Sequence, residues 1–281
     1  MCARVGPARA TDVDIEVLYC DMCQSDLHQV CDDWANTMWP CIPGDEIVGR
    51  VSAVGAEVTR FEVGDLAGVG CMVDSCQHRA AYKKGKEQDG ENGWLATCNG
   101  PFKPDGSNTF GDHPDRIVVT EGFVLKIPEN FDLKKVGVVA LGRTDRRRAG
   151  ADMTVFTTRL EKAQDADHLG AQAAVVPADE DALKSSFDFI LDTSPVGHDV
   201  NPYRQRLNHD GQLVLVGALE KLEPPDNVLR ATQRVGIAGS RTGSLSETQE
   251  GLDFCGRHGS TAQVEVIGIQ DLNGVFGRCS R

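Results

Sequence analysis

The segment of residues 39–71, WPCIPGDEIVGRVSAVGAEVTRFEVGDLAGVGC, is the part of the sequence that most restricts the fold. It begins with Pro and Gly turn residues and continues into a β-branched run at 47–54, which is typical of a buried strand. Gly55 ends this run. A second strand-like run follows and ends at the Gly-Asp turn at 64–65. Asp45 and Glu46 stand where the chain leaves the first turn and enters the first strand. The segment therefore predicts strands and turns, with two carboxylates at the start of the first strand.

Length and composition allow two globular domains. The chain has 281 residues, of which 40% are hydrophobic and 25% charged, as in an ordinary globular protein. A formal net charge of −13 argues against nucleic acid or an anionic membrane surface as a partner, and no apolar stretch of about 18 residues is present to span a bilayer. The N-terminus has no apolar core of the secretory type, so a cytoplasmic location is expected. In that reducing compartment the ten cysteines indicate metal ligands or buried thiols rather than disulfides.

A second motif, CQSDLH at residues 23–28, follows an alternating run at 14–20 that predicts a strand with one wet face. Together the two motifs resemble the zinc-dependent alcohol dehydrogenases of the medium-chain dehydrogenase/reductase superfamily, and within them the NADP-linked cinnamyl alcohol dehydrogenase branch. The family signature is Gly-His-Glu, two residues, Gly, five residues, Gly, two residues, Val. This chain has Asp45 in the histidine place and keeps the other positions as Gly44, Glu46, Gly49, Gly55 and Val58.

This resemblance implies an α/β fold made of two domains. A GroES-like β-rich catalytic domain would take residues 1–130, with residues 262–281 returning to it. A Rossmann-type, doubly wound parallel-sheet domain, incomplete in this chain, would take residues 131–261. The implied activity is zinc-assisted hydride transfer between NADP(H) and a small-molecule primary alcohol or aldehyde, and a homodimer is a candidate assembly.

The resemblance makes Cys23 the first ligand of a catalytic zinc, Asp45 the second, and Glu46 a carboxylate close beneath the metal. Carboxylate oxygens can bind zinc, so Asp45 does not abolish the site. The third family ligand is a cysteine in a segment that this chain lacks, and no cysteine lies between Cys98 and Cys255. We therefore expect weak or absent zinc. The alternative for the Asp45-Glu46 pair is an exposed turn before a strand, and the sequence leaves the two open.

Ser25 and His28 match the residues that carry a proton between the substrate and water in this family. Such a path is needed because an alcohol loses its proton as hydride leaves. Asp26 matches a family carboxylate that orients metal ligands. The family's structural zinc is expected to be absent, because its four cysteine places hold one cysteine and three other residues: Cys76, Arg79, Tyr82 and Gly90.

The predicted coenzyme-binding domain departs further from the family pattern. The run 136–142 predicts the first Rossmann strand, yet the three glycine places of the phosphate loop hold Ala140, Gly142 and Asp145. Only residues 143–152 then precede the next strand, whereas a crossover helix with its turns needs about a dozen residues. After that strand come Thr157, Thr158, Arg159 and, further on, Lys162.

Hydroxyls and cations at the end of this strand suit the 2′-phosphate of NADP, and the alternative is the start of a helix with surface cations. The apolar runs 187–192, 212–217 and 236–240 predict strands of a parallel sheet buried on both faces. A capping box at 246–249 predicts a helix that Gly259 ends, and the segment 264–267 is expected to return to the first domain.

Three functions are consistent with this sequence. The first is the zinc- and NADP-dependent oxidoreductase. The second is a catalytically impaired member of the same family that acts as a binding protein, because the metal ligands, the phosphate loop and the structural zinc site are all altered. The third, zinc-free quinone reductase chemistry, is disfavoured by the intact Cys23–His28 motif.

Overall fold

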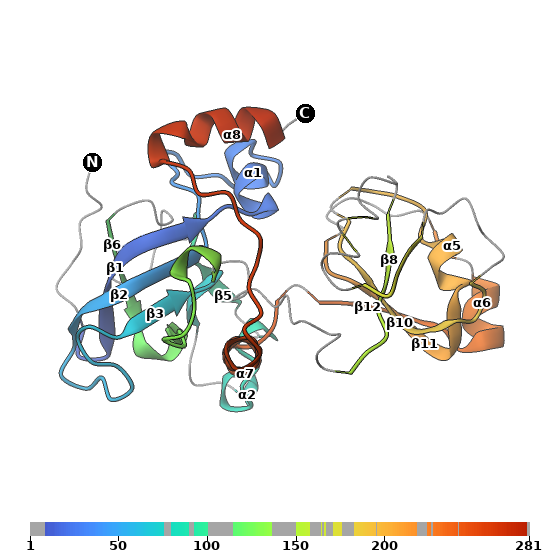
Figure 1. Cartoon of the computed structure of the whole chain (residues 1–281), viewed down its shortest axis with the longest axis horizontal. Helices are drawn as coiled ribbons and strands as arrows, with labels where there is room; N and C mark the ends of the chain where they lie inside the picture. Colours follow the sequence, from blue (N-terminus) through green and yellow to red (C-terminus); the bar gives the residue numbers. More distant parts are fainter. Residues whose placement is uncertain are drawn as a thin grey trace. The chain divides into compact units, whose positions relative to one another are not determined.

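In a computed structural model the chain forms two compact units, Met1–Thr144 with Gly243–Arg281 and Asp145–Thr242 (Figure 1). The second unit covers fewer residues than the predicted domain 131–261. The predicted domain boundaries stay a prediction. No helix among the described residues is long and apolar enough to cross a membrane. The structure describes residues 9–75, 80–89, 93–100, 115–136, 150–157, 164, 166, 171–175, 183–194, 196–217, 224–225, 227–240 and 242–279.

The first unit is built on an antiparallel sheet. Its strand order is β6 (Arg116–Thr120), β1 (Asp12–Asp21), β2 (Glu46–Val54), β3 (Leu66–Val69) and β7 (Leu125–Lys126) (Figure 1). A separate pair joins β4 (Met72–Ser75) to β5 (Trp94–Ala96). The predicted strands at 14–20 and 47–54 are confirmed. Their inward side chains form one core with residues of β3, β4 and η2 (Glu121–Phe123), including Val13, Ile15, Ile47, Val51, Val69 and Phe123.

Helix α7 (Leu245–His258) packs within the first unit. Its Leu252 and Cys255 join Leu125 and Phe131 in a second buried cluster. The helix ends at Gly259 in the left-handed conformation, as predicted. Its N-cap is Ser244 and not Ser246, so the predicted capping box was two residues too late. Gln249 is engaged elsewhere, because its side-chain amide exchanges two hydrogen bonds with the backbone of Lys126.

The remaining helices of the first unit are short. They are α1 (Gln24–Val30), α2 (Ala80–Lys83), η1 (Glu87–Asp89), η3 (Leu133–Lys135), η4 (Ile269–Asp271) and α8 (Leu272–Cys279). Residues 264–267 have no regular secondary structure and lie in the part of the chain, Gly243–Arg281, that belongs to the first unit. Val266 is 54% exposed, and apolar side chains of this segment therefore do not join a core.

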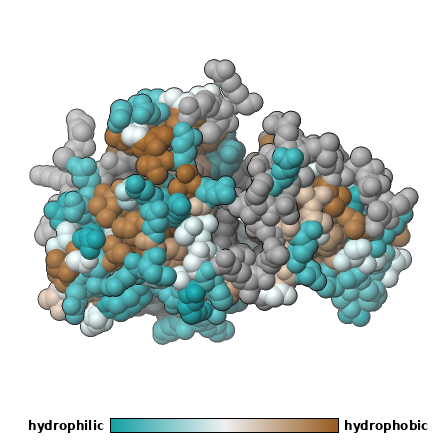
Figure 2. Space-filling model, in the orientation of Figure 1, coloured by the Kyte–Doolittle hydropathy of each residue, from teal (hydrophilic) through white to brown (hydrophobic). Residues whose placement is uncertain are grey.

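The second unit contains parallel strands, as predicted. One sheet has the order β10 (Phe187–Asp192), β11 (Leu207–Leu215), β12 (Gly236–Gly239), and a separate pair joins β8 (Thr154–Phe156) to β9 (Ala173–Val175). Helices α5 (Asn201–Arg204) and α6 (Asn227–Gln233) accompany them. Burial on both faces was predicted, yet only one face of β10 is buried, since Ile190 is 7% exposed while Phe189 is 46% exposed. Figure 2 shows hydrophobic residues on the surface of both units.

Candidate active site

Cys23 occupies the N-cap of α1, immediately after β1 ends. Its backbone is extended, and its sulfur accepts a hydrogen bond from the Ser25 N–H at 3.3 Å. In return, Asp26 Oδ2 accepts the Cys23 N–H at 2.9 Å. This capping box fixes the thiol and the Asp26 carboxyl on the same first turn, because residues three apart in a helix share a face.

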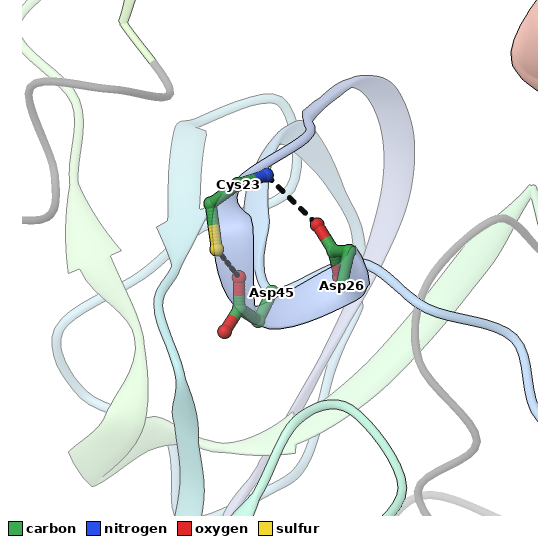
Figure 3. A group of neighbouring side chains, drawn as sticks. All are labelled: Cys23, Asp26 and Asp45. Atoms are coloured by element: carbon green, nitrogen blue, oxygen red, sulfur yellow. Dashed lines mark hydrogen bonds between the residues drawn. The ribbon is translucent and has the colours of Figure 1, made fainter. Parts of the chain in front are cut away.

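Asp45 belongs to the other motif, the segment 39–71, and also lies next to Cys23. In the antiparallel ladder Asp21 of β1 pairs with Glu46 of β2, so the residues just beyond this pair, Cys23 and Asp45, lie next to each other. The Cys23 thiol donates to Asp45 Oδ1 at 3.6 Å, as Figure 3 shows, and the Ser25 hydroxyl donates to Asp45 Oδ2 at 3.3 Å. One ligand atom from each of Cys23, Asp26 and Asp45 lies within 4.8 Å of the other two. We call these three residues the donor group.

Burial and mutual charge make every member of the donor group hard to ionise. Burial, followed by the Asp45 charge, raises the pKa of Asp26 to about 7. Burial also raises the pKa of Asp45, although hydrogen bonds from Cys23 and Ser25 oppose the shift. The pKa of the Cys23 thiol is raised by burial and then by the charges of Asp45 and Asp26. A bound cation would relieve this repulsion.

A prediction follows for the metal-free protein. A carboxyl whose pKa is raised in the folded state contributes stability that is full below its unfolded pKa near 3.8 and is lost as pH rises through about 7. Asp26→Asn removes this penalty, and the amide oxygen can still accept the Cys23 N–H. We expect Asp26→Asn to stabilise the metal-free protein by on the order of a few kcal/mol at pH 8, and much less at pH 5.

Urea unfolding followed by tryptophan fluorescence measures this effect, because all three tryptophans, Trp34, Trp39 and Trp94, belong to the first unit. The control is Asp33→Asn, which removes a half-exposed carboxyl group that pairs with His28. A gain for Asp26→Asn of equal size at both pH values would contradict the assignment.

Glu46 and His28 lie near the donor group without joining it. Glu46 is 4% exposed at the start of β2 and is not a member of the group. His28 Nδ1 lies 2.7 Å from Asp33 Oδ2, and its ring packs on Trp34 with 5.5 Å between centroids. Within the described residues no hydrogen bond joins Ser25 to His28, and the proton path through these two residues stays a prediction.

Of the predicted coenzyme-binding residues, the structure describes Thr157. It follows β8, is 9% exposed, and donates its N–H to the carbonyl of Val175. The other predicted coenzyme residues lie outside the described residues: Ala140, Gly142, Thr158, Arg159 and Lys162. So do Cys76, Arg79 and Gly90 of the predicted structural zinc position, and the absence of that zinc stays a prediction.

Sequence reasoning missed the position of Asp26 within the donor group. The available signal was its spacing of three residues from the N-cap, which is the spacing of a capping box. It also missed that the thiols of Cys41 and Cys98 interact with each other, which lowers the pKa of Cys41 and raises that of Cys98.

The chemistry of the donor group suits a divalent metal. A thiolate and carboxylate oxygens are both established zinc ligands. Three acidic groups from two chain segments converge in a buried place. The set contains one sulfur and no imidazole nitrogen, so it is poorer in strong zinc donors than the family's set of two cysteines and one histidine.

Comparison with known proteins identifies the family. The model of the alcohol dehydrogenase GroES-like domain matches residues 9–129. The chain is 37% identical to aldehyde reductase YahK of Escherichia coli, over 96% of this chain and 87% of that protein. It is 34% identical to probable cinnamyl alcohol dehydrogenase 6 of Arabidopsis thaliana, over 96% and 84%.

Solved structures give the same result. A cinnamyl alcohol dehydrogenase (SbCAD4) from Sorghum bicolor superposes with a TM-score of 0.88 at 31% identity, covering 100% of this chain and 89% of that one. The enzyme from Helicobacter pylori, solved in complex with NADP(H), gives 0.87 at 28% identity over 97% and 88%. These relatives confirm the predicted fold class, GroES-like and Rossmann-type domains together, and the predicted enzyme class. The chain is an oxidoreductase of the zinc alcohol dehydrogenase family in the medium-chain dehydrogenase/reductase superfamily, in its cinnamyl alcohol dehydrogenase-like branch.

Proposed function

We propose that this protein interconverts a primary alcohol and its aldehyde with NADP(H), at a metal held by Cys23 and Asp45. The observation that supports the metal most directly is the convergence of the Cys23 sulfur with two carboxyl groups within 4.8 Å. When bound, zinc supplies Lewis-acid polarisation of the substrate oxygen, and NADPH supplies the hydride. In this proposal Glu46, buried beside Asp45, adds negative charge that helps to retain the cation.

Ser25 and His28 are the proposed proton carriers. The Ser25 oxygen lies 2.6 Å from the Cys23 sulfur and donates to Asp45, so the hydroxyl is next to the proposed metal ligands. The His28 side chain is 18% exposed and its partner Asp33 is 51% exposed, which gives the imidazole a route to water. A proton would pass between the Ser25 hydroxyl and the His28 ring, and then to solvent through Asp33.

The proposed coenzyme residues favour NADP over NAD. Thr157 lies at the carboxyl end of β8, the edge at which Rossmann-type sheets bind dinucleotides. The sequence places Ala140 and Gly142 in the phosphate loop, and Thr158, Arg159 and Lys162 after Thr157. Guanidinium and ammonium groups suit a 2′-phosphate, which NADP has and NAD lacks.

We expect NADPH to bind at least about tenfold more tightly than NADH, because one charge-assisted hydrogen bond contributes about 1.5–3 kcal/mol. Arg159→Ala should remove most of this preference. Arg234→Ala, which changes an exposed arginine of the same unit, is the control and should preserve it. Fluorescence titration of NADPH and NADH measures both dissociation constants. Tighter binding of NADH by the wild-type protein would refute the NADP assignment.

The decisive experiment is cinnamaldehyde-dependent oxidation of NADPH by protein loaded with zinc. The proposed function predicts turnover that needs zinc and falls at least about a hundredfold in Ser25→Ala, the scale of general acid–base contributions. A second function is favoured by the poor donor set, namely a catalytically impaired family member that binds nucleotide. NADPH binding without turnover at any zinc concentration would establish that alternative. The cytoplasmic location and the homodimer remain part of the proposal.

A further inference from the structure

We propose that Asp26 is a direct ligand of the divalent metal in this protein, alongside Cys23 and Asp45. The family resemblance gives Asp26 an orienting role and places Glu46 beneath the metal. In the described part of the chain, however, the group of metal-binding side chains that converge within 4.8 Å contains Asp26 and not Glu46. The proposal rests on the proposed function for the presence of a metal, and it concerns which residues hold it.

The substitution at position 45 removes the reason for Asp26 to remain an orienting residue. A carboxylate orients a histidine ligand by accepting the N–H of its ring. Asp45 has no such N–H, so Asp26 has no imidazole to orient here. Figure 3 shows the Asp45 carboxyl group at the Cys23 sulfur and the Asp26 carboxyl group at the Cys23 backbone nitrogen, and one ligand atom of each residue lies within 4.8 Å of the other two.

The two oxygens of Asp26 have different environments. Oδ2 accepts the Cys23 N–H at 2.9 Å and so holds the carboxyl in place. Oδ1 is buried and has no partner at hydrogen-bond geometry within the described residues, although the backbone N–H of Gly44 also favours the charged form of the carboxyl group. The residue is only 1% exposed, so water does not replace the missing partner at its surface. A buried carboxylate oxygen without a partner is costly, and coordination to a cation would satisfy it.

Within the described part of the chain, no protein cation pairs with the carboxyl groups of the donor group. None of the ion pairs between described residues includes Asp26 or Asp45. For the two buried carboxyl groups and the thiol to be ionised together, a counter-charge from outside the described residues is needed. A divalent cation provides it at the point where all three ligand atoms meet.

Cobalt(II) is a suitable probe, because its visible absorption reports the ligands and geometry around the ion. We expect Asp26→Asn to weaken Co²⁺ binding at least about tenfold, and to change the band positions at saturating Co²⁺. Asparagine keeps an oxygen for the Cys23 N–H, so the helix cap is retained. Two controls remove charge without removing the proposed ligand: Asp21→Asn, a carboxyl that acts electrostatically on Asp26, and Glu46→Gln, the rival ligand. Both should leave the saturated spectrum unchanged.

A saturated Asp26→Asn spectrum identical to that of the wild type would overturn the proposal, because a purely orienting residue alters affinity but not the ligand set. A spectrum changed by Glu46→Gln and not by Asp26→Asn would overturn it too. X-ray absorption of zinc-loaded wild-type protein needs no variant. It should show one sulfur at about 2.3 Å and oxygens at about 2.0–2.2 Å, whereas two sulfurs would contradict the three-residue set. None of these measurements uses NADPH or an aldehyde, so Asp26 can fail as a ligand while the proposed reaction stands, and the reverse.

Discussion

Replacing Asp45 with histidine is expected to tighten zinc binding at least about tenfold. Residues that merely support a metal ligand change affinity by roughly 10–100-fold when mutated, and a direct ligand should matter at least as much. The substitution has two favourable consequences. It supplies an imidazole nitrogen, a donor that zinc prefers, and it removes one of the buried carboxyls that repel each other around Cys23. Competition with a chromophoric chelator at pH 7.5 measures the zinc dissociation constants of both proteins.

The control for Asp45→His is Asp45→Asn, which removes the same charge without adding a zinc-binding nitrogen. We expect Asp45→Asn to bind zinc no better than the wild-type protein. If both variants bound zinc equally tightly, charge repulsion rather than the identity of the ligand would limit the zinc affinity of the wild-type site. Restored imidazole at position 45 should also return Asp26 to an orienting role, so the effect of Asp26→Asn on the saturated Co²⁺ spectrum should disappear in the Asp45→His background.

The strands that position this site could be predicted from sequence because close packing leaves little choice. A Cβ at Gly49 would lie 2.3 Å from the carbonyl oxygen of Glu16, and one at Gly55 would lie 2.3 Å from that of Arg9. These glycines are therefore required where β2 and its following turn cross neighbouring backbone. The β-branched run between them then fixes the register that brings Asp45 to Cys23.

Tertiary contacts decided the features that sequence reasoning missed. Both Ser244 and Ser246 begin a sequence compatible with a capping box, but Gln249 is held by the backbone of Lys126, and Glu247 is left to complete the cap at Ser244. The role of Asp26 depends on the residue at position 45, which is distant in sequence, so neither motif alone reveals it.

The second large effect is expected in the second unit, where Arg206→Met should raise stability. Arg206 is 1% exposed. Its Nη1 donates to the carbonyl of Pro202 at 2.8 Å, but Nε and Nη2 have no acceptor within the described residues. Its guanidinium stacks at 5.5 Å from the centroid of Phe156 and 5.9 Å from that of Tyr203. A desolvated contact of this kind contributes about 2 kcal/mol, whereas burying a cation without an anionic partner among the described residues costs several kcal/mol.

Methionine fills a similar unbranched volume between the two rings and has no unsatisfied donors. We expect Arg206→Met to stabilise the second unit by about 1–4 kcal/mol, the gain seen when buried charges are replaced by apolar side chains of similar size. Hydrogen exchange of β10 and β11 peptides measures this gain, while tryptophan fluorescence follows the first unit, whose midpoint should not change. Arg234→Met is the matched control, because Arg234 is 71% exposed and pairs with Asp210, and its effect should stay within about 0.5 kcal/mol. Faster exchange in Arg206→Met would show instead that the buried guanidinium, through its stacking and its bond to Pro202, stabilises the packing of β11 against Phe156.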